Sequence, residues 1–278
     1  MPANSSIASL ALVRDTFREA FARKIFWAFF GCSTALILFF IFIMRVDVVE
    51  GALATMSIFG RSGQSQGVEQ MVKNVHAGIA NFLYSIGMCL AIFASAGLTS
   101  AVFEPGRIEL LLSKPVSRYH ILLGRYIGNV LVVASNLFYL VLAIWIIFGI
   151  KTQVWAAGFL FAALSTLFVF SVLLTVAVLV GVLWESTAVA IIATFGVMVI
   201  SLIVSAKSTW ERLLSSEWSR DVVRGLYYML PRLVDIGRIN HSLITGQPVT
   251  DWPAVWTTAA FGAVMLAISL FLFARRDF

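Results

Sequence analysis

Six long apolar stretches divide this chain of 278 residues, and they constrain its fold more than any other feature. A helix needs roughly 20 apolar residues to cross the hydrocarbon core of a bilayer, which is about 30 Å thick. None of the stretches has a charged residue at its centre. We therefore expect an all-α membrane protein, with six transmembrane helices in a single domain over residues 1–278. The expected spans are about 25–44, 78–103, 122–150, 153–184, 187–205 and 254–274.

The composition agrees with a membrane protein and excludes several other classes. Hydrophobic residues make up 60% of the chain and charged residues only 12%, which is more apolar material than a soluble core requires. The net charge of +6 comes from basic residues at the ends of apolar stretches, where headgroup contact explains it, so we expect no nucleic-acid partner. Cys32 and Cys89 lie inside apolar stretches, and the three histidines are far apart, so no disulfide framework or metal site is expected.

The N-terminal residues 1–24 are expected to form a cytoplasmic amphipathic helix. One side would carry apolar residues at helical spacing, namely Leu10, Val13, Phe17, Ala20 and Phe21. The other side would carry mostly charged residues, namely Arg14, Arg18, Glu19, Arg23 and Lys24. Glu19 and Arg23 form an i,i+4 pair. An apolar span follows without a break, which favours a helix lying in the membrane interface over a plain solvated helix.

The distribution of Lys and Arg predicts the topology. Basic residues gather in the N-terminal segment, in the loop at 103–125 and at the end of the chain. With six spans these regions fall on one side of the membrane, which the positive-inside preference makes cytoplasmic. The other side receives a loop at 45–77 and a long outer segment at 206–253. That outer segment is also rich in Arg. The predicted orientation therefore depends on the basic residues in the shorter loops, which the positive-inside preference weighs most.

The outer regions contain two further patterns. WERLLSSEWSRDVVRGLYYMLP has apolar residues at helical spacing, which predicts one or two short helices ended near Pro231, and ITGQPV at 244–249 indicates a turn. RSGQSQG at 61–67 has glycines but lacks the lysine of a phosphate-binding loop, so we interpret it as a flexible outer loop.

The spans themselves offer few groups that could do chemistry. They lack central charges that could bind a coupling ion, and no nucleophile stands with a base as a hydrolase requires. If the protein is a pump, its energy must come from another chain. A standalone channel or membrane enzyme is the alternative. Gly124 and Gly128 form a GxxxG pattern, which either allows a close helix contact or arises by chance.

The stretch FEPGRIELLLSKPVSRYHILLGR, residues 103–125, places many charges between two spans. Pro105 can occupy the first turn of a helix, and Pro115 would end it. Between them Ile108, Leu111 and Leu112 share one apolar face, and SRYHILLGRY restarts the helix into the third span. This pattern predicts a short cytoplasmic helix that could dock on a partner, with an ordinary interfacial loop as the alternative.

Part of this stretch, ELLLSKPVSRYHILLGRYIG, resembles the loop between the second and third spans of ABC type-2 transporter permeases. In that family a Leu-rich stretch precedes Ser-x-Pro-x-Ser-Arg and then a Gly. The matching positions are Glu109, Leu110, Leu111, Leu112, Ser113, Pro115, Ser117, Arg118 and Gly124. The segment LPRLVDIGRINHSLITGQPV and the ending FARRDF are also similar to the family. Pro105-Gly106-Arg107 departs from it, where many relatives have a more regular polar run.

The resemblance implies a non-catalytic permease subunit of an ATP-driven transporter, and we expect an exporter in the bacterial inner membrane with both termini cytoplasmic. Two copies would form a homodimer, and a separate cytoplasmic ATPase would bind ATP and Mg, so the chain itself needs no cofactor. The loop would supply a coupling helix. Its expected ATPase contacts are Glu104, Arg107, Glu109, Leu111, Lys114, Pro115 and Arg118, with Glu185 as a second cytoplasmic contact. A variant of the same architecture would transmit ATP-driven motion to a periplasmic protein instead.

Overall fold

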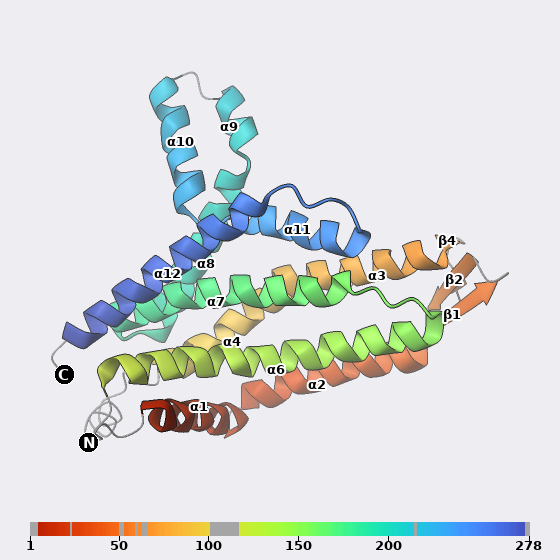
Figure 1. Cartoon of the computed structure of the whole chain (residues 1–278), viewed down its shortest axis with the longest axis horizontal. Helices are drawn as coiled ribbons and strands as arrows, with labels where there is room; N and C mark the ends of the chain where they lie inside the picture. The colour runs from red at the N-terminus through yellow and green to blue at the C-terminus, as the bar shows by residue number, and fades with distance from the viewer. Residues whose placement is uncertain are drawn as a thin grey trace.

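The computed structural model describes residues 5–22, 24–49, 53–58, 61–62, 66–100, 117–213 and 216–275 (Figure 1). These segments are helical almost throughout. The first helices are α1 (Ser5–Ala22), α2 (Lys24–Leu38), the π-helix η1 (Phe39–Ile43), α3 (Val68–Phe82), the π-helix η2 (Leu83–Gly87) and α4 (Met88–Ser100). The later helices are α6 (Arg118–Thr152), α7 (Gly158–Trp184), α8 (Thr187–Ser205), α9 (Lys207–Leu213), α10 (Glu217–Met229), α11 (Leu233–Thr245) and α12 (Trp252–Arg275).

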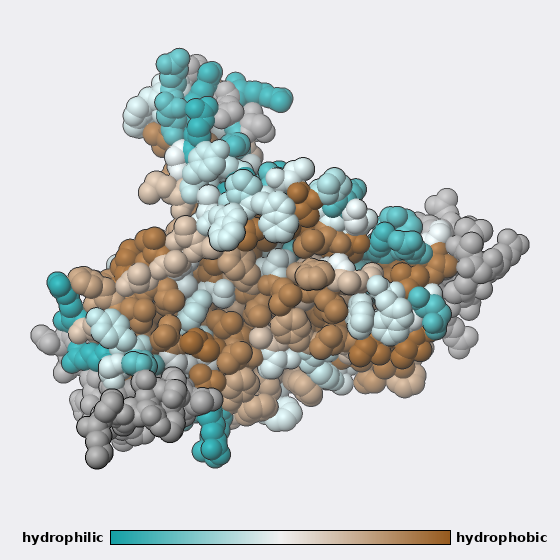
Figure 2. Space-filling view, in the orientation of Figure 1, coloured by the Kyte–Doolittle hydropathy of each residue, from teal (hydrophilic) through white to brown (hydrophobic). Residues whose placement is uncertain are grey.

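Five of the described helical stretches are long and apolar enough to cross a membrane. They are Val68–Gly97, Arg118–Thr152, Gly158–Trp184, Thr187–Ser205 and Trp252–Arg275. A sixth is added when Val13–Ala22 and Phe26–Phe42, bent by 75° relative to each other, are counted as one broken span. The chain is therefore a multi-pass membrane protein, with five or six candidate spans among the residues that the structure describes. Figure 2 shows the apolar surface of this helical body.

The second span begins at Val68, about ten residues before the expected start at 78. The expectation was late because polar residues occupy the first turns of this span. Glu69, Gln70, Lys73 and Asn74 lower the local hydropathy, yet they belong to α3. Glu69 and Lys73 form an i,i+4 ion pair of 2.7 Å, which supports the helix there.

Between η1 and α3, where the sequence indicated only a loop, the described residues form four short strands. They are β1 (Met44–Val49), β2 (Leu53–Ile58), β3 (Arg61–Ser62) and β4 (Gln66–Gly67). β1 and β2 are antiparallel, with Met44 opposite Ile58 and Val49 opposite Leu53, and both β3 and β4 pair with β2. The two ends of the RSGQSQG segment thus belong to a small sheet. The Val residues of MRVDVV fit this assignment, since β-branched residues favour strands.

Helix α7 is the centre of the bundle. It packs against α12, α8, α11, α6 and α4, and most of its residues are buried. Its sequence is apolar on all sides, as a helix enclosed by others requires. At its start Gly158 lies directly against the backbone of Leu243 in α11, where a Cβ atom would collide with the Leu243 carbonyl oxygen. This contact holds α11 against the Gly158 end of α7.

The outer segment forms three helices. α9 and α10 make a hairpin that projects from the bundle, and its tip is hydrophilic (Figures 1 and 2). α10 ends at Met229, just before Pro231, which agrees with the expected one or two helices. A third helix, α11, follows Pro231 and was not expected. It ends at Gly246, whose φ of 76° forms the left-handed turn that ITGQPV indicated.

Candidate functional site at the α6 end of the bundle

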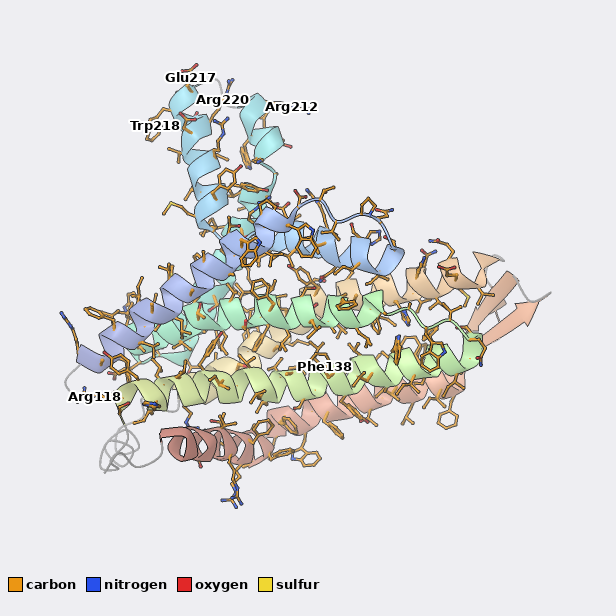
Figure 3. The ribbon with its side chains drawn as sticks, in the orientation of Figure 1. Arg118, Phe138, Arg212, Glu217, Trp218 and Arg220 are labelled. Carbon is orange, nitrogen blue, oxygen red and sulfur yellow. The ribbon has the colours of Figure 1, made fainter. Side chains whose placement is uncertain are left out.

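Most residues of the predicted ATPase contact lie outside the described part of the chain. They are Glu104, Arg107, Glu109, Leu111, Lys114 and Pro115. Arg118 is the first residue of α6 (Figure 3), and Glu185 follows α7. α6 and α7 are antiparallel neighbours, and the hydroxyl of Tyr126 donates a hydrogen bond of 3.0 Å to the carbonyl oxygen of Ser171. Arg118 and Glu185 therefore lie at the same end of the bundle, which we call the α6 end.

The start of α6 is set by Ser117. This residue has an extended backbone, with φ of −67° and ψ of 145°, and its carbonyl oxygen accepts a bond of 3.0 Å from the N–H of His120. The Ser117 hydroxyl also contacts Nδ1 of His120. The helix therefore restarts where SRYHILLGRY predicted, directly after the segment that should contact the ATPase.

Glu185 lies in the tight turn between α7 and α8. Its φ is 53°, and its N–H donates a bond of 2.9 Å to the carbonyl oxygen of Gly181. This left-handed conformation costs a residue other than glycine about 1 kcal/mol. Ser186 then caps α8, because its hydroxyl accepts a bond of 3.5 Å from the N–H of Val189. A glutamate is thus held in a strained position at the α6 end.

A buried cluster of charges joins α1 to α6 seven residues after the start of α6. The Arg125 side chain is only 2% exposed. Its Nη1 donates to Glu19 at 2.6 Å, and its Nη2 donates to Asp15 at 2.9 Å. A buried cation is stable only when such partners satisfy it, so these bonds hold the two helices together.

Close backbone packing reinforces this cluster. A Cβ atom on Gly128 would lie 2.7 Å from the Cβ of Thr16, which is closer than atoms can approach without movement. Thr16 and Ala20 are both buried, whereas Arg14 and Arg18 are exposed. The close contact suggested by Gly124 and Gly128 is therefore present at Gly128, and its partner is α1.

The Arg125 cluster was missed by the sequence analysis, which treated Arg125 only as a basic residue near a span end. It paired Glu19 with Arg23, but Arg23 lies outside the described residues, and the partner seen for Glu19 is Arg125. The position of Arg125 beside Gly124 and Gly128 could have indicated the cluster. A charged residue next to a close helix contact is buried by the neighbouring helix, so it needs a counter-ion there.

A second polar cluster lies at the base of the α9–α10 hairpin. The Tyr227 hydroxyl donates to Oδ2 of Asp235 at 2.6 Å, and Nε of Arg232 donates to the same oxygen at 2.8 Å. The Arg232 guanidinium also contacts the Tyr227 hydroxyl. Burial and the bond to the Asp235 carboxylate raise the pKa of Tyr227 to about 12. Burial alone would lower the pKa of Arg232, but the Asp235 carboxylate outweighs it and raises that pKa above its ordinary value.

The corner at residues 231–235 also binds three helices of the bundle. The Ser201 hydroxyl in α8 donates to the carbonyl oxygen of Pro231, and the Tyr84 hydroxyl in η2 donates to that of Leu233. The backbone N–H of Arg232 donates to the Thr258 hydroxyl in α12 at 3.0 Å. The hairpin base is thus tied to elements that cross the membrane.

Apolar spanning helices packed around α7 define a polytopic membrane domain, and a comparison with protein families says which kind. The model of the ABC-2 family transporter proteins matches residues 10–278. The chain therefore belongs to the ABC-2 transporter family, whose membrane components are permeases that work with an ABC ATPase. A comparison with curated proteins gave no match.

Proposed function

We propose that this chain is the permease subunit of an ATP-driven ABC exporter in a bacterial inner membrane. It acts as a homodimer with both termini in the cytoplasm, and a separate ATPase subunit binds ATP and Mg. Family membership supports the transport role. The observation that carries the coupling mechanism is the buried Arg125 cluster, because it fastens α1 to α6 close to the segment that leads into the α6 end.

The proposed contact with the ATPase runs from Glu104 to Arg118. Its apolar residue Leu111 seats in a groove on the ATPase, and the basic residues Arg107, Lys114 and Arg118 contact the rim of that groove. Charged rims of this kind mainly set specificity and the rate of association. Glu185, at the same end of the bundle, forms a second contact.

Motion of the contact segment passes into the membrane through α6. The segment leads directly into Arg118, and α6 is a continuous helix of 35 residues. Since Arg125 and Gly128 hold α1 against the first turns of α6, the two helices move together. The exposed Arg14 and Arg18 of α1 suit contact with anionic headgroups, so α1 would follow the membrane surface as it moves.

The coupling proposal is tested by charge reversal in the contact segment. The tagged chain is purified from membranes of its native host, and the co-purifying ABC ATPase is measured by mass spectrometry and ATP hydrolysis. We expect Arg107→Glu with Lys114→Glu to lower both signals while the amount of inserted chain is unchanged. Arg220→Glu, at the hairpin tip (Figure 3), is the matched control and should leave both signals intact. Full association and turnover in the double variant would exclude docking through this segment.

A second candidate function is transmission of motion to a periplasmic protein without transport. The hairpin favours this reading, because it projects from the bundle while its base is bonded to α8, η2 and α12. Leu213 and Trp218 are exposed apolar side chains on it. In this case Leu213→Ala with Trp218→Ala would leave ATPase association unchanged but abolish the periplasmic output. An unaltered output would exclude the hairpin as the site of transmission.

A further inference from the structure

A cavity of about 150 Å³ lies within one copy of the chain, between α2 and the η2–α4 region. α2 packs mainly on α6, and α4 packs mainly on α7. α6 and α7 therefore line the bottom of the cavity, and α2 and α4 line its sides. Representative lining residues are Phe29 and Leu36 of α2, Ala91 and Ala94 of α4, Leu137 of α6 and Phe170 of α7.

The lining suits a ligand that makes no hydrogen bonds. No charged side chain is among the lining residues, all of which belong to the described part of the chain. Among the polar lining residues, the Ser33 hydroxyl donates to Oδ1 of Asn136 at 3.0 Å, and the Thr166 hydroxyl donates to the carbonyl oxygen of Ala162 at 2.9 Å. Most of the lining is apolar, so a polar ligand would lose its water and gain few partners, whereas a hydrocarbon loses no hydrogen bonds.

The length of the cavity matches one leaflet of a bilayer. On α2 the lining extends from Phe26 to Leu36. At about 1.5 Å per residue this is about 15 Å along the helix. The hydrocarbon core is about 30 Å thick, so each leaflet contributes about 15 Å. The cavity runs along spanning helices, which is also the direction of lipid chains.

The cavity opens to the surface of the bundle. Phe82 and Leu90 contribute to its lining and are also exposed, so they flank the opening. In a spanning segment such a surface faces lipid chains. A helix of a second copy is about 10 Å wide or more and cannot enter a space of this volume, whereas a single hydrocarbon chain can.

The π-helix η2 belongs to the same wall. It contributes Leu83 and Gly87, and π-helical turns, which are rare, frequently occur at functional sites. We propose that this cavity binds the hydrocarbon chain of a bilayer lipid, which enters sideways between α2 and α4. The lipid site does not depend on the ATPase contact, so it can be tested on the purified chain without ATP.

The test uses photoactivatable lipid. The full chain is placed in nanodiscs that contain phosphatidylethanolamine with a diazirine in the middle of one acyl chain, irradiated, and mapped by mass spectrometry. We expect Phe29, Leu36 and Ala91 to be labelled more strongly than Ile192 and Ile203, which are exposed on α8. Equal or weaker labelling in the cavity of the unaltered chain would overturn the proposal.

A filling variant makes the test specific. Ala94→Phe occupies the cavity and should remove most labelling from Phe29 and Leu36 while Ile192 keeps its label. Ile203→Phe, on the outer surface of α8, is the control and should leave cavity labelling unchanged. Ala91→Phe fills the same space from a neighbouring turn if the first variant does not fold. Unchanged cavity labelling in a folded filling variant, or crosslinks to a second copy at Phe29 in place of lipid, would overturn the proposal.

Discussion

Glu19 and Arg125 are 106 positions apart in the chain, yet a carboxylate oxygen of Glu19 lies 2.6 Å from Nη1 of Arg125. The Glu19 side chain is 12% exposed, whereas that of Asp15, the other partner of Arg125, is 56% exposed. The bond to Glu19 is therefore the better shielded of the two, and it should contribute more to the attachment of α1.

Replacing Arg125 should release α1. Arg125→Leu removes the 2.6 Å ion pair with Glu19, and breaking a buried pair in this way costs about 3–5 kcal/mol. We expect a lower thermal unfolding temperature in detergent and faster proteolysis within residues 5–22. Glu19→Gln should have a larger effect than Asp15→Asn. The control is Arg224→Leu, which removes an exposed pair of 3.4 Å with Asp221 and should cost at most about 1 kcal/mol. Equal effects of the Arg125 and Arg224 variants would contradict the prediction.

Gly128→Ala should displace α1 from α6. The added Cβ would lie 2.7 Å from the Cβ of Thr16, so the two helices must separate. Thr16→Gly in the same chain removes the opposing atoms and should restore the attachment in part. The restoration is incomplete because glycine inside a helix lowers the stability of that helix by about 1 kcal/mol. Gly196→Ala is the matched control, because nothing lies within 4 Å of the new Cβ. Crosslinking between cysteines placed on α1 and α6 measures the separation, and unchanged crosslinking in Gly128→Ala would contradict the close contact.

The Tyr227 cluster should lose stability only at strongly alkaline pH. The pKa of Tyr227 is raised to about 12, so the fold favours the neutral hydroxyl. That stabilisation is fully present below about pH 10, the ordinary pKa of tyrosine, and is lost as the pH rises through about 12. Absorbance titration of Tyr227→Phe against the unaltered chain should show one tyrosine missing from the late phase. Titration of Tyr227 near pH 10 would contradict this prediction.

Glu185→Gly should stabilise the fold while weakening the ATPase contact. Glycine relieves the left-handed strain at φ of 53°, which is a gain of up to about 1 kcal/mol. Gln153 has a similar φ of 59° at the opposite end of the bundle, so Gln153→Gly should give a similar gain without affecting the ATPase. Unfolding temperature and ATPase co-purification measure the two effects separately. If Glu185→Gly leaves co-purification at its normal level, Glu185 is not a contact.

The hairpin tip and the α6 end should lie on opposite sides of the membrane. In a chain with Cys32→Ser and Cys89→Ser, a cysteine at Glu217 should react with a membrane-impermeant maleimide added to intact cells. A cysteine at Glu185 should react only after the membrane is opened. Reaction of both in intact cells would contradict the assigned topology.

Hydropathy located five stretches that are long and apolar enough to span a membrane, because these stretches end in clear breaks. α8 has the expected bounds, 187–205, since Glu185 and Ser186 interrupt the apolar run before it. Hydropathy failed at α3, where polar residues occupy helical turns, and at β1–β4, where short pairings depend on partners that a local pattern does not identify. The third outer helix was missed because Pro231 indicated an end, although a proline just before a helix is also a common start.

The attachment of α1 could be predicted only in part. The GxxxG pattern indicated that something packs closely on Gly128, and the helical spacing in residues 9–24 indicated a helix with two faces. That these two features meet is a long-range relation, and nothing local connects Thr16 with Gly128 or Glu19 with Arg125. The polar corner at Pro231 could not be predicted for the same reason, because it also depends on long-range contacts. Its partners Tyr84, Ser201 and Thr258 come from three separate spans.

The enclosure of α7 has a consequence for how the protein is made. The chain is synthesised from its N-terminus, so α12, which covers much of α7, is made well after α7. Until α12 has been made, the part of the α7 surface that α12 will cover must contact lipid. The apolar sequence of α7 allows this contact, because the exposed surface needs no hydrogen-bonding partner from the protein. The covering of α7 by α12 therefore follows the synthesis of both helices, and a chain cut short before residue 252 would leave part of its central helix uncovered.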